Sequence, residues 1–235
     1  MQLVKIQLLT GTLKLLSGLR IGASEGEIRI GGVDNQVIRN PVTKEPYIPG
    51  SSLKGKVRSL LEWSSGAVKP EPLRIEDMRD DRPLVRPILQ LFGVGGGEKV
   101  SEDLAAKLGP TRLSFWDASL KPEWVEKFRE ENPLLVEVKT ENRINRITSE
   151  ARDPRQAERV PAGAVFDFRL SLKLLDIDGD GSELRRIMFR GLRLLELDSL
   201  GGSGSRGYGK VKFHDLKLDG ESVQAEFDAL DPFAP

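Results

Sequence analysis

Four segments of the chain are predicted to be β-strands. In the first, residues 3–16, apolar and polar positions alternate, and Val4, Ile6 and Leu8 share one face. This is the period of a strand that buries one of its two faces. The alternation returns at residues 165–175, where Phe and Leu occupy every second position. The other two strands are expected at residues 111–120 and 210–218.

Two segments have the apolar spacing of amphipathic helices. The first begins after Ser51 or Ser52, and either hydroxyl is expected to cap the helix N-terminus. Its apolar stripe, with the i, i+4, i+7, i+8 spacing, consists of Leu53, Val57, Leu60 and Leu61. The second helix begins near Ser182, and its apolar face consists of Leu184, Ile187, Met188, Leu192 and Leu195.

The elements follow one another as strand, helix, strand, strand, helix, strand. This is the order of the ferredoxin-like β-α-β-β-α-β motif, an α+β fold with the RRM-like core of RNA-recognition domains. The fold by itself does not identify a function. We expect a single domain that consists of a core (1–63, 111–132, 164–220), a partly helical insertion (64–110) and an extended arm with many charges (133–163).

The composition excludes several kinds of site. The chain has no Cys, which removes disulfides, thiolate nucleophiles, Fe–S clusters and Cys-based zinc sites, and its single His, His214, leaves no His-rich metal site. The 36 basic and 36 acidic residues cancel, so the net charge gives no sign of a nucleic acid or a membrane as partner. The N-terminal residues contain no uninterrupted apolar run, so we expect no signal peptide or membrane span and a soluble cytoplasmic protein.

Two short motifs match ligand-binding patterns without the required context. Gly202, Gly204 and Gly207 fit the dinucleotide fingerprint, but a predicted helix precedes them and a strand follows, which is the reverse of the order needed. Residues 176–181, DIDGDG, copy the first half of a calcium loop, but Ile187 occupies the position that requires a Glu. We therefore expect no dinucleotide site, and a plain strand-to-helix turn at residues 176–181.

Two other segments carry groups that suit a phosphate ligand. Residues 49–58, PGSSLKGKVR, place two hydroxyls and three cations at a helix N-terminus, which attracts anions. A capped helix with a solvated basic face explains these residues equally well. In residues 201–209, GGSGSRGYG, five glycines allow close approach of the backbone, Arg206 offers a fork for phosphate and Tyr208 a ring for stacking. The alternative is an ordinary loop between a helix and a strand.

Several longer motifs, in a fixed order, resemble those of the backbone subunit of type III-A (Csm) CRISPR–Cas effector complexes, a member of the RAMP superfamily. The resemblance covers nearly the whole chain and is weakest in residues 64–110. It rests on GLRIGAS, GGVDNQVIRNPVTKEPYIPGSSLKGKVRSLLE, TRLSFWDA, KTENRINRITSEARDPRQAERVPAGAVF and LGGSGSRGYGKVKF.

The resemblance implies a specific function in antiviral defence. In this family, copies of the subunit stack into a helical filament together with other Csm subunits, hold the CRISPR RNA in a groove and pair it with a complementary target single-stranded RNA. A β-hairpin thumb, here residues 133–163, wedges into the guide–target duplex at regular intervals and flips out a nucleotide. The family cleaves the target endonucleolytically beside each flipped nucleotide and leaves a cyclic phosphate and a 5′-hydroxyl.

The resemblance also implies which residues form the site. Asp34 of GGVDN corresponds to the cleavage residue and is the one candidate ligand of a divalent cation, Mg²⁺ or Mn²⁺, whereas zinc is not expected. The residues expected to bind RNA are Arg20, Ser51, Ser52, Lys54, Lys56, Arg58, Gly202, Gly204, Arg206 and Tyr208. The thumb is expected to present Lys139, Arg143, Arg146, Arg155 and Arg159 to RNA or to a neighbouring subunit.

Two other functions remain open on the sequence alone. A scaffold that binds guide RNA without cleaving a target is the main alternative. A ribonuclease that processes the guide is the other, and it is less consistent with the chain because such an enzyme normally uses a His-based acid/base site. Zero net charge is compatible with RNA binding if cations gather at residues 54–58 and at Arg206 while acidic residues lie elsewhere, and we expect that division.

Overall fold

One antiparallel sheet of five strands organises the fold. The computed structural model describes residues 1–22, 36–95, 101 and 106–234. The strands of the sheet are β1 (Leu3–Leu15), β3 (Leu113–Phe115), β7 (Val165–Leu175), β8 (Val211–Leu218) and β9 (Glu221–Ser222). Two further pairs lie outside it, namely β2 (Tyr47–Ile48) with β4 (Ala118–Ser119), and β5 (Glu137–Ile144) with β6 (Ala151–Arg159).

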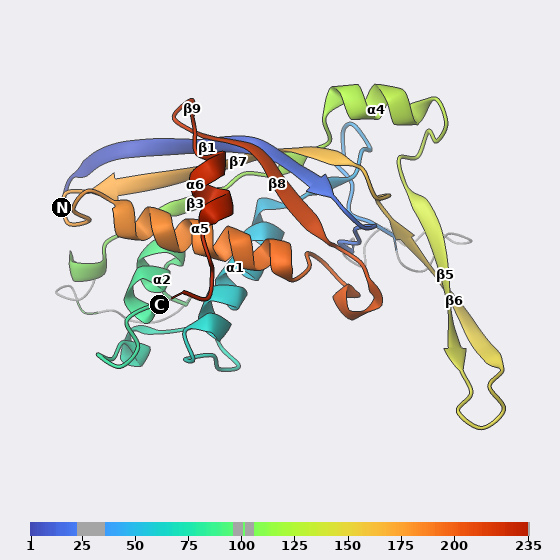
Figure 1. The fold of residues 1–235 in the computed structure, drawn as a ribbon, viewed down its shortest axis with the longest axis horizontal. Coiled ribbons are helices and arrows are strands. Elements are labelled where there is room, and N and C mark those ends of the chain that lie inside the picture. The colour runs from blue at the N-terminus through green and yellow to red at the C-terminus, as the bar shows by residue number, and fades with distance from the viewer. Residues whose placement is uncertain (23–35, 96–100, 102–105, 235) are drawn as a thin grey trace.

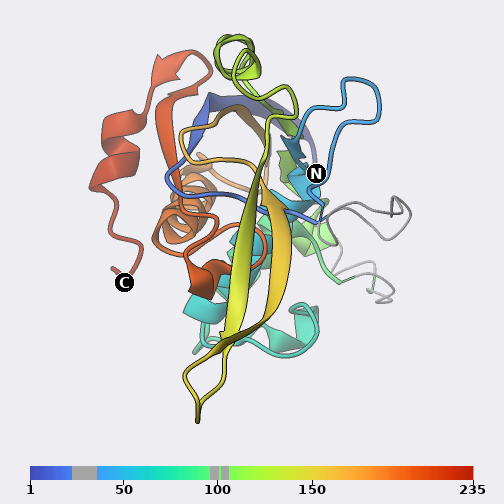
Figure 2. The same ribbon diagram turned by 90° about the vertical axis from the view of Figure 1, so that its right-hand side faces the viewer.

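Helices cover one face of this sheet, and the hairpin β5–β6 projects away from the body of the protein. The helices are α1 (Gly50–Ser64), α2 (Val85–Phe92), α4 (Pro122–Arg129), α5 (Ser182–Leu197) and α6 (Gln224–Ala229), with the 3-10 turns η2 (Ile75–Asp77) and η3 (Gly204–Arg206). Figure 1 shows the sheet above α1, α2 and α5, and Figure 2 shows the hairpin ending beyond the body. In the described part of the chain, no helix is long and apolar enough to cross a membrane.

The strand order confirms the predicted fold class. The sheet runs β3-β7-β1-β8-β9, so the third and first strands of the core lie side by side in its centre and the second and fourth flank them. Helix α1 lies between β1 and β3 in the chain, and α5 connects β7 to β8. This is the split β-α-β arrangement of the ferredoxin-like fold. After residue 218 the chain adds β9 and α6, which the sequence pattern does not predict.

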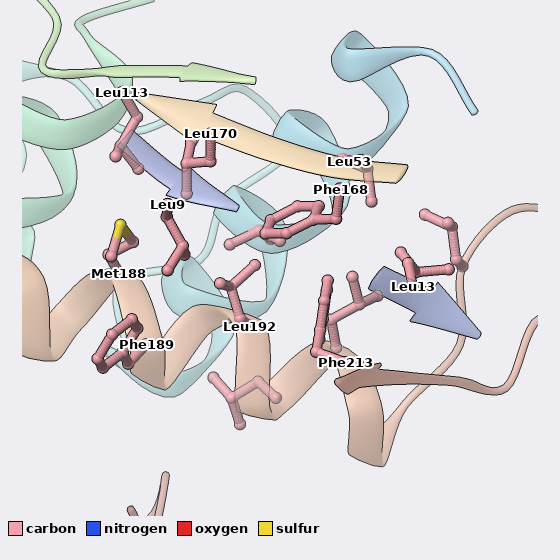
Figure 3. Close-up of a cluster of buried hydrophobic side chains, with 14 of the residues drawn as sticks. Leu9, Leu13, Leu53, Leu113, Phe168, Leu170, Met188, Phe189, Leu192 and Phe213 are labelled. Atoms are coloured by element: carbon pink, nitrogen blue, oxygen red, sulfur yellow. The ribbon is translucent and has the colours of Figure 1, made fainter. Parts of the chain in front are cut away.

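The hydrophobic core fills the space between the sheet and the helices. Leu9 of β1 pairs in register with Leu170 of β7, and the rings of Phe168 and Phe213 meet edge to face with 4.8 Å between their centroids. All the residues predicted for the apolar face of the second helix are buried. Figure 3 shows part of this core, with Met188 and Leu192 of α5 pointing toward the sheet and Leu53 contributed by α1.

The first strand buries the face opposite to that of Val4, Ile6 and Leu8. Val4, Ile6 and Leu8 are exposed, whereas Leu9 and Leu13 lie in the core. Side chains alternate along a strand, so parity decides which residues share a face. The helices cover the face of the odd-numbered residues from Leu9 onward. The pattern therefore predicts the strand and its half-burial correctly, but it does not determine which of the two faces is buried.

The acidic turn at residues 176–181 is the expected strand-to-helix turn, and its carboxylates bind groups of the chain itself. Asp178 accepts hydrogen bonds of 2.8 and 3.0 Å from the Arg112 guanidinium, and both side chains are fully buried. Such a pair is stable only when its remaining polar atoms are also bound. The other two carboxylates accept nearby backbone N–H groups, Asp176 from Gln2 and Asp180 from Ser182.

Two glycines provide a test of the packing between α1 and α5. A Cβ atom on Gly191 of α5 would lie 2.6 Å from Val57 Cγ1, whereas a Cβ on Gly55 of α1 would meet no atom within 4 Å. Helix propensity favours Ala at both positions by about 1 kcal/mol. We expect Gly55→Ala to raise the free energy of unfolding by about 0.5–1 kcal/mol. We expect Gly191→Ala to lower it by about 1–3 kcal/mol, because it overpacks the helix contact. Urea unfolding measures both, and equal stabilisation would contradict this packing.

Candidate nucleic-acid interface

The segment that continues β1, residues 16–22, is hydrogen-bonded to several distant parts of the chain and is named the hub. Leu19 exchanges two backbone hydrogen bonds, of 2.8 and 2.9 Å, with Val160 just after β6. The carbonyl of Arg20 accepts the N–H of Gly202 at 2.9 Å. The hub therefore joins the base of the hairpin to the glycine-rich loop, residues 201–209.

Glycines allow this loop to pack closely against the chain. Gly201 and Gly209 have φ angles of +75° and +72°, in the left-handed region that disfavours other residues. A Cβ on Gly201 would clash with the carbonyl of Arg20, and one on Gly209 would clash with that of Leu200. Gly202 and Gly204, two of the residues expected to bind RNA, lie between these tight contacts. The glycines thus have a clear role within the fold itself.

Tyr208 is buried at the base of the hairpin. Its side chain is 1% exposed, and Lys139 Nζ and Arg159 Cζ lie over the ring at 4.5 and 5.0 Å from its centroid. Burial, together with the nearby Glu141 carboxylate, raises the pKa of Tyr208. In this structure the ring is therefore a platform for two hairpin cations. It is not open to a nucleotide base, in contrast to the expected stacking role.

Arg206 is paired with an acidic residue of the hairpin. Its Nη1 atom lies 2.7 Å from Oε2 of Glu141, and Lys139 Nζ lies 3.2 Å from the other carboxylate oxygen. The hydrogen bond from Arg206, aided by Lys139, lowers the pKa of Glu141 to about 2 from its ordinary value of 4.5. Arg206 remains 62% exposed. The pair links the glycine-rich loop to β5 while part of the guanidinium stays accessible.

A cavity of about 590 Å³ lies beside this pair and is lined mainly by arginines. Arg143 in it is bound to Asp153 at 3.0 Å. Arg146 and Arg155 have no carboxylate within ion-pair distance among the described residues. Unpaired guanidinium groups on an open surface suit the phosphates of RNA. Three of the predicted thumb residues thus line this cavity, which we name the hairpin cavity, and the other two lie over Tyr208.

The N-terminus of α1 is capped by a residue that the sequence analysis did not identify. The helix begins at Gly50, and the Asp117 carboxylate accepts its N–H at 2.7 Å. Neither Ser51 nor Ser52 makes the expected capping hydrogen bond, because the helix begins before them. The carboxylate also occupies the end of the helix dipole that would attract a phosphate. Of the two hydroxyls, that of Ser51 lies on the more exposed residue.

The three cations of α1 have different surroundings. Lys56 Nζ lies 2.6 Å from Asp198, and Arg58 Nε lies 2.7 Å from Glu62. Lys54 has no ion-pair partner in the described part of the chain. The expected separation of cations from acidic residues was therefore wrong. Partly buried cations require a nearby opposite charge, and the fold supplies one to Lys56, Arg58 and Arg206 alike.

Asp34, the expected cleavage residue, lies outside the described residues, but both ends of its loop are described. The Ile38 N–H donates to the carbonyl of Ile21 in the hub at 2.8 Å. The Val37 N–H donates to the carboxylate of Glu158 on β6 at 3.2 Å. The loop that carries Asp34 therefore starts and ends between the hub and the base of the hairpin.

The described residues contain no group of three or more His, Cys, Asp or Glu side chains that fits a metal ion. The carboxylates of the interface are instead bound to cations or backbone N–H groups, as are those of Glu141 and Glu158. The described residues therefore do not form a metal centre around the interface, and Asp34 is the only predicted ligand.

The acidic partners Asp117 and Asp198 are the residues of this interface that motif analysis missed. Asp117 lies in the quoted TRLSFWDA motif, which was the one available signal of its importance. Asp198 lies shortly before the glycine-rich loop and has no motif of its own. Both act on α1 from distant parts of the sequence, so no local pattern reveals their partners.

Comparisons with known proteins identify the family to which the chain belongs. The sequence matches the RAMP superfamily over residues 12–212. It is 40% identical to the CRISPR system Cms endoribonuclease Csm3 of Methanothermobacter thermautotrophicus, over 98% of this chain and 97% of that protein. The proteins of the same name from Streptococcus thermophilus and Mycobacterium tuberculosis are 43% and 40% identical, over 87% and 95% of this chain and 86% and 90% of their own lengths.

Two solved structures are similar in fold. One is a Csm3–Csm4 subcomplex of the type III-A interference complex, with a TM-score of 0.56, 29% identity and coverage of 93% of this chain and 80% of that one. The other is Csm3 of Methanopyrus kandleri, with a TM-score of 0.56, 26% identity and coverage of 88% and 75%. These matches confirm the resemblance to type III-A backbone subunits. The chain therefore belongs to the RAMP superfamily and, within it, to the Csm3 endoribonuclease family.

Proposed function

We propose that this protein is the RNA-cleaving backbone subunit of a type III-A CRISPR effector complex. It binds the CRISPR RNA and cleaves complementary single-stranded RNA at regular intervals. The relatives that match nearly its whole length are named endoribonucleases. One observation carries the proposal. The base of the hairpin, the glycine-rich loop and residues 37–38, which follow the Asp34 loop, are all hydrogen-bonded at or beside the hub. The hairpin cavity, with two arginines that have no carboxylate partner among the described residues, lies next to them.

The cleavage reaction requires few protein groups, because RNA supplies its own nucleophile. When the target is held with a 2′-oxygen in line with the adjacent P–O5′ bond, that oxygen attacks the phosphorus and the P–O5′ bond breaks. The products are a 2′,3′-cyclic phosphate and a 5′-hydroxyl. Asp34 accepts the proton of the 2′-hydroxyl, and the departing O5′ takes up a proton from solvent water to give the 5′-hydroxyl. The residues that flank its loop support this role, because Ile38 is bonded to the hub and Val37 to Glu158 at the base of the hairpin.

The hairpin has the properties of a wedge between bases. Ile147 at its tip is 93% exposed and apolar. Asn145 shapes the tip, because its side chain accepts hydrogen bonds from the N–H groups of Ile147 and Thr148. Apolar side chains inserted between base steps unstack them. Arg146 and Arg155 in the hairpin cavity are suited to hold the phosphates of the nucleotide that the tip displaces.

The partners follow from the same proposal. The protein stacks on copies of itself in a helical filament in the cytoplasm, bound to the CRISPR RNA and the target RNA and joined by other Csm subunits. A similar chain in a solved Csm3–Csm4 subcomplex supports the association with Csm subunits. The hairpin leaves the body of the protein and is therefore free to reach a neighbouring copy (Figure 2).

Replacing Asp34 tests the catalytic assignment. In the assembled complex, Asp34→Ala should slow cleavage of a complementary RNA by about 100-fold or more, because the acceptor of the proton is lost. Binding of guide and target should persist, and Asp34→Asn should behave like Asp34→Ala. Denaturing electrophoresis of an end-labelled target measures cleavage, and a gel-shift assay measures binding. Unchanged cleavage by both variants would overturn Asp34 as the cleavage residue, and no cleavage by the parent complex would favour a guide-binding scaffold without nuclease activity.

A divalent cation, Mg²⁺ or Mn²⁺, is proposed as the cofactor, with Asp34 as its candidate ligand. Chelation with EDTA should stop target cleavage by the assembled complex while the guide and target remain bound. Addition of excess Mg²⁺ or Mn²⁺ should restore the activity, whereas Zn²⁺ should not. Electrophoresis of the labelled target follows each step. Cleavage that continues at the full rate in EDTA would exclude a readily exchangeable cation.

Glu141 should compete with RNA phosphate for Arg206. Its pKa of about 2 keeps the carboxylate charged at neutral pH, and its contribution to stability is lost only as the pH falls from about 4.5 to 2. We expect Glu141→Gln to tighten RNA binding several-fold. The slope of log affinity against log salt concentration should become steeper by about 0.7, the value for one added phosphate contact on a single strand. Fluorescence anisotropy with a labelled single-stranded RNA at pH 7 measures both quantities.

The matched control is Glu45→Gln, which removes the carboxylate from an ion pair with Arg129 that does not line the hairpin cavity. This variant should bind RNA as the parent does. Weaker binding by Glu141→Gln alone would mean that the carboxylate orients Arg206 for RNA and does not compete with it.

A further inference from the structure

We propose that the helical insertion carries a second binding site for RNA phosphates, in a cavity between η2 and α2. The proposal rests on the proposed function, because it extends the RNA-binding surface beyond the hairpin and the hub. The cavity measures about 430 Å³. It is lined by Met78, Arg79, Asp80, Arg82, Pro83, Arg86, Lys107 and Leu108. We name it the insertion cavity.

The lining of the insertion cavity is strongly basic. Four of its residues are cations and one, Asp80, is acidic. Arg79 and Arg86 are exposed, and Arg82 is half-buried. Arg86 lies in the first turn of α2, and Arg82 lies in the turn just before this helix. Both residues line the insertion cavity.

These cations lack the ion pairs that the fold supplies elsewhere. Among the described residues, none of the four cations that line the insertion cavity has a carboxylate within ion-pair distance. Asp77, close by in the sequence, is already bound to Lys69 at 2.6 Å. By contrast, Lys56, Arg58 and Arg206 each have an acidic partner. In the described part of the chain, the insertion cavity thus combines an open volume with an excess of cations over its one acidic residue, Asp80, which favours a polyanion.

The insertion cavity lies next to a second cavity, which reaches α1. This second cavity, of about 340 Å³, is lined by Lys54, Gly93 and Thr111 among others, and both cavities share Leu108. Lys54 is the cation of α1 without an ion-pair partner in the described part of the chain. Basic side chains therefore line two neighbouring cavities, Lys54 of α1 the second cavity and Arg79, Arg82, Arg86 and Lys107 the insertion cavity.

The chemistry of the insertion cavity favours a nucleic-acid backbone over an acidic peptide. Three of the four cations are arginines, whose planar forks match phosphate oxygens. Among the described residues, no aromatic side chain lines the insertion cavity to stack on a base. Such a site contacts phosphates without regard to sequence, as a guide of variable sequence would require.

The test compares two triple variants of the full chain in RNA binding. In the first, Arg79, Arg82 and Arg86 become Ala. In the second, Lys127, Arg186 and Lys217 become Ala, which removes the same charge from exposed positions outside all three cavities. Fluorescence anisotropy with a labelled single-stranded RNA gives the affinity at several salt concentrations. The first variant should bind RNA about 10- to 100-fold more weakly at 0.1 M salt. Its slope of log affinity against log salt concentration should be shallower by about 2, the value for three lost phosphate contacts. The control should match the parent.

The outcomes separate this proposal from the function on which it rests. Equal affinity and equal salt dependence for both triple variants would overturn the site in the insertion and leave the hairpin interface unaffected. If the first triple variant then also failed to associate with another Csm subunit, the cavity would be assigned to a protein partner. A parent chain that bound no RNA would overturn both proposals. The single variant Arg79→Glu, at an exposed position, provides a second measurement if the triple variant unfolds, and it should weaken binding several-fold.

Discussion

The backbone hydrogen bonds of the hub are the constraint on which the candidate site depends. β1 lies in the centre of the sheet, between β7 and β8, so its position is set by the largest hydrogen-bonded structure in the protein. Its continuation then bonds to Val160, to Gly202 and to the stem of the Asp34 loop. Backbone groups away from water require partners, and these loops supply them to one another. The base of the hairpin, the glycine-rich loop and Ile38, which follows the Asp34 loop in the sequence, are therefore held at the hub by main-chain bonds.

Ion pairing explains how a chain with no net charge presents a basic surface. At the base of the hairpin, carboxylates from β5 and β6 hold Arg206 and the N–H of Val37. These pairs orient side chains and also reduce the attraction for phosphate, because each carboxylate offsets a cation. Among the described residues, several arginines without a carboxylate partner line two cavities, one along the hairpin and one in the insertion. The local balance of charge thus differs from the total, and the local balance is what a bound strand of RNA meets.

Several residue patterns that suggest ligands turn out to stabilise the fold. The carboxylates of residues 176–181 bind Arg112 and nearby N–H groups, and Gly201 and Gly209 permit contacts that a Cβ would prevent. The ring of Tyr208 makes cation–π contacts with Lys139 and Arg159. In each case the residue types expected at a ligand site were present, but the partner is another part of the same chain. Small polar residues and glycines suit both a ligand site and a tightly packed loop. Both kinds of structure need hydrogen-bonding groups and a close approach of the backbone.

Periodicity in the sequence determined the strands, the two main helices, their order and hence the ferredoxin-like fold, because a strand or helix repeats its contacts every two or 3.6 residues. The apolar face of α5 followed from this alone. The cap on α1, the partners of Lys56 and Arg206, and the buried face of β1 did not. Asp117 and Gly50, or Arg206 and Glu141, meet only after the sheet and helices have packed. Only the tertiary structure decided these contacts, because they depend on distances between elements that are far apart in the sequence.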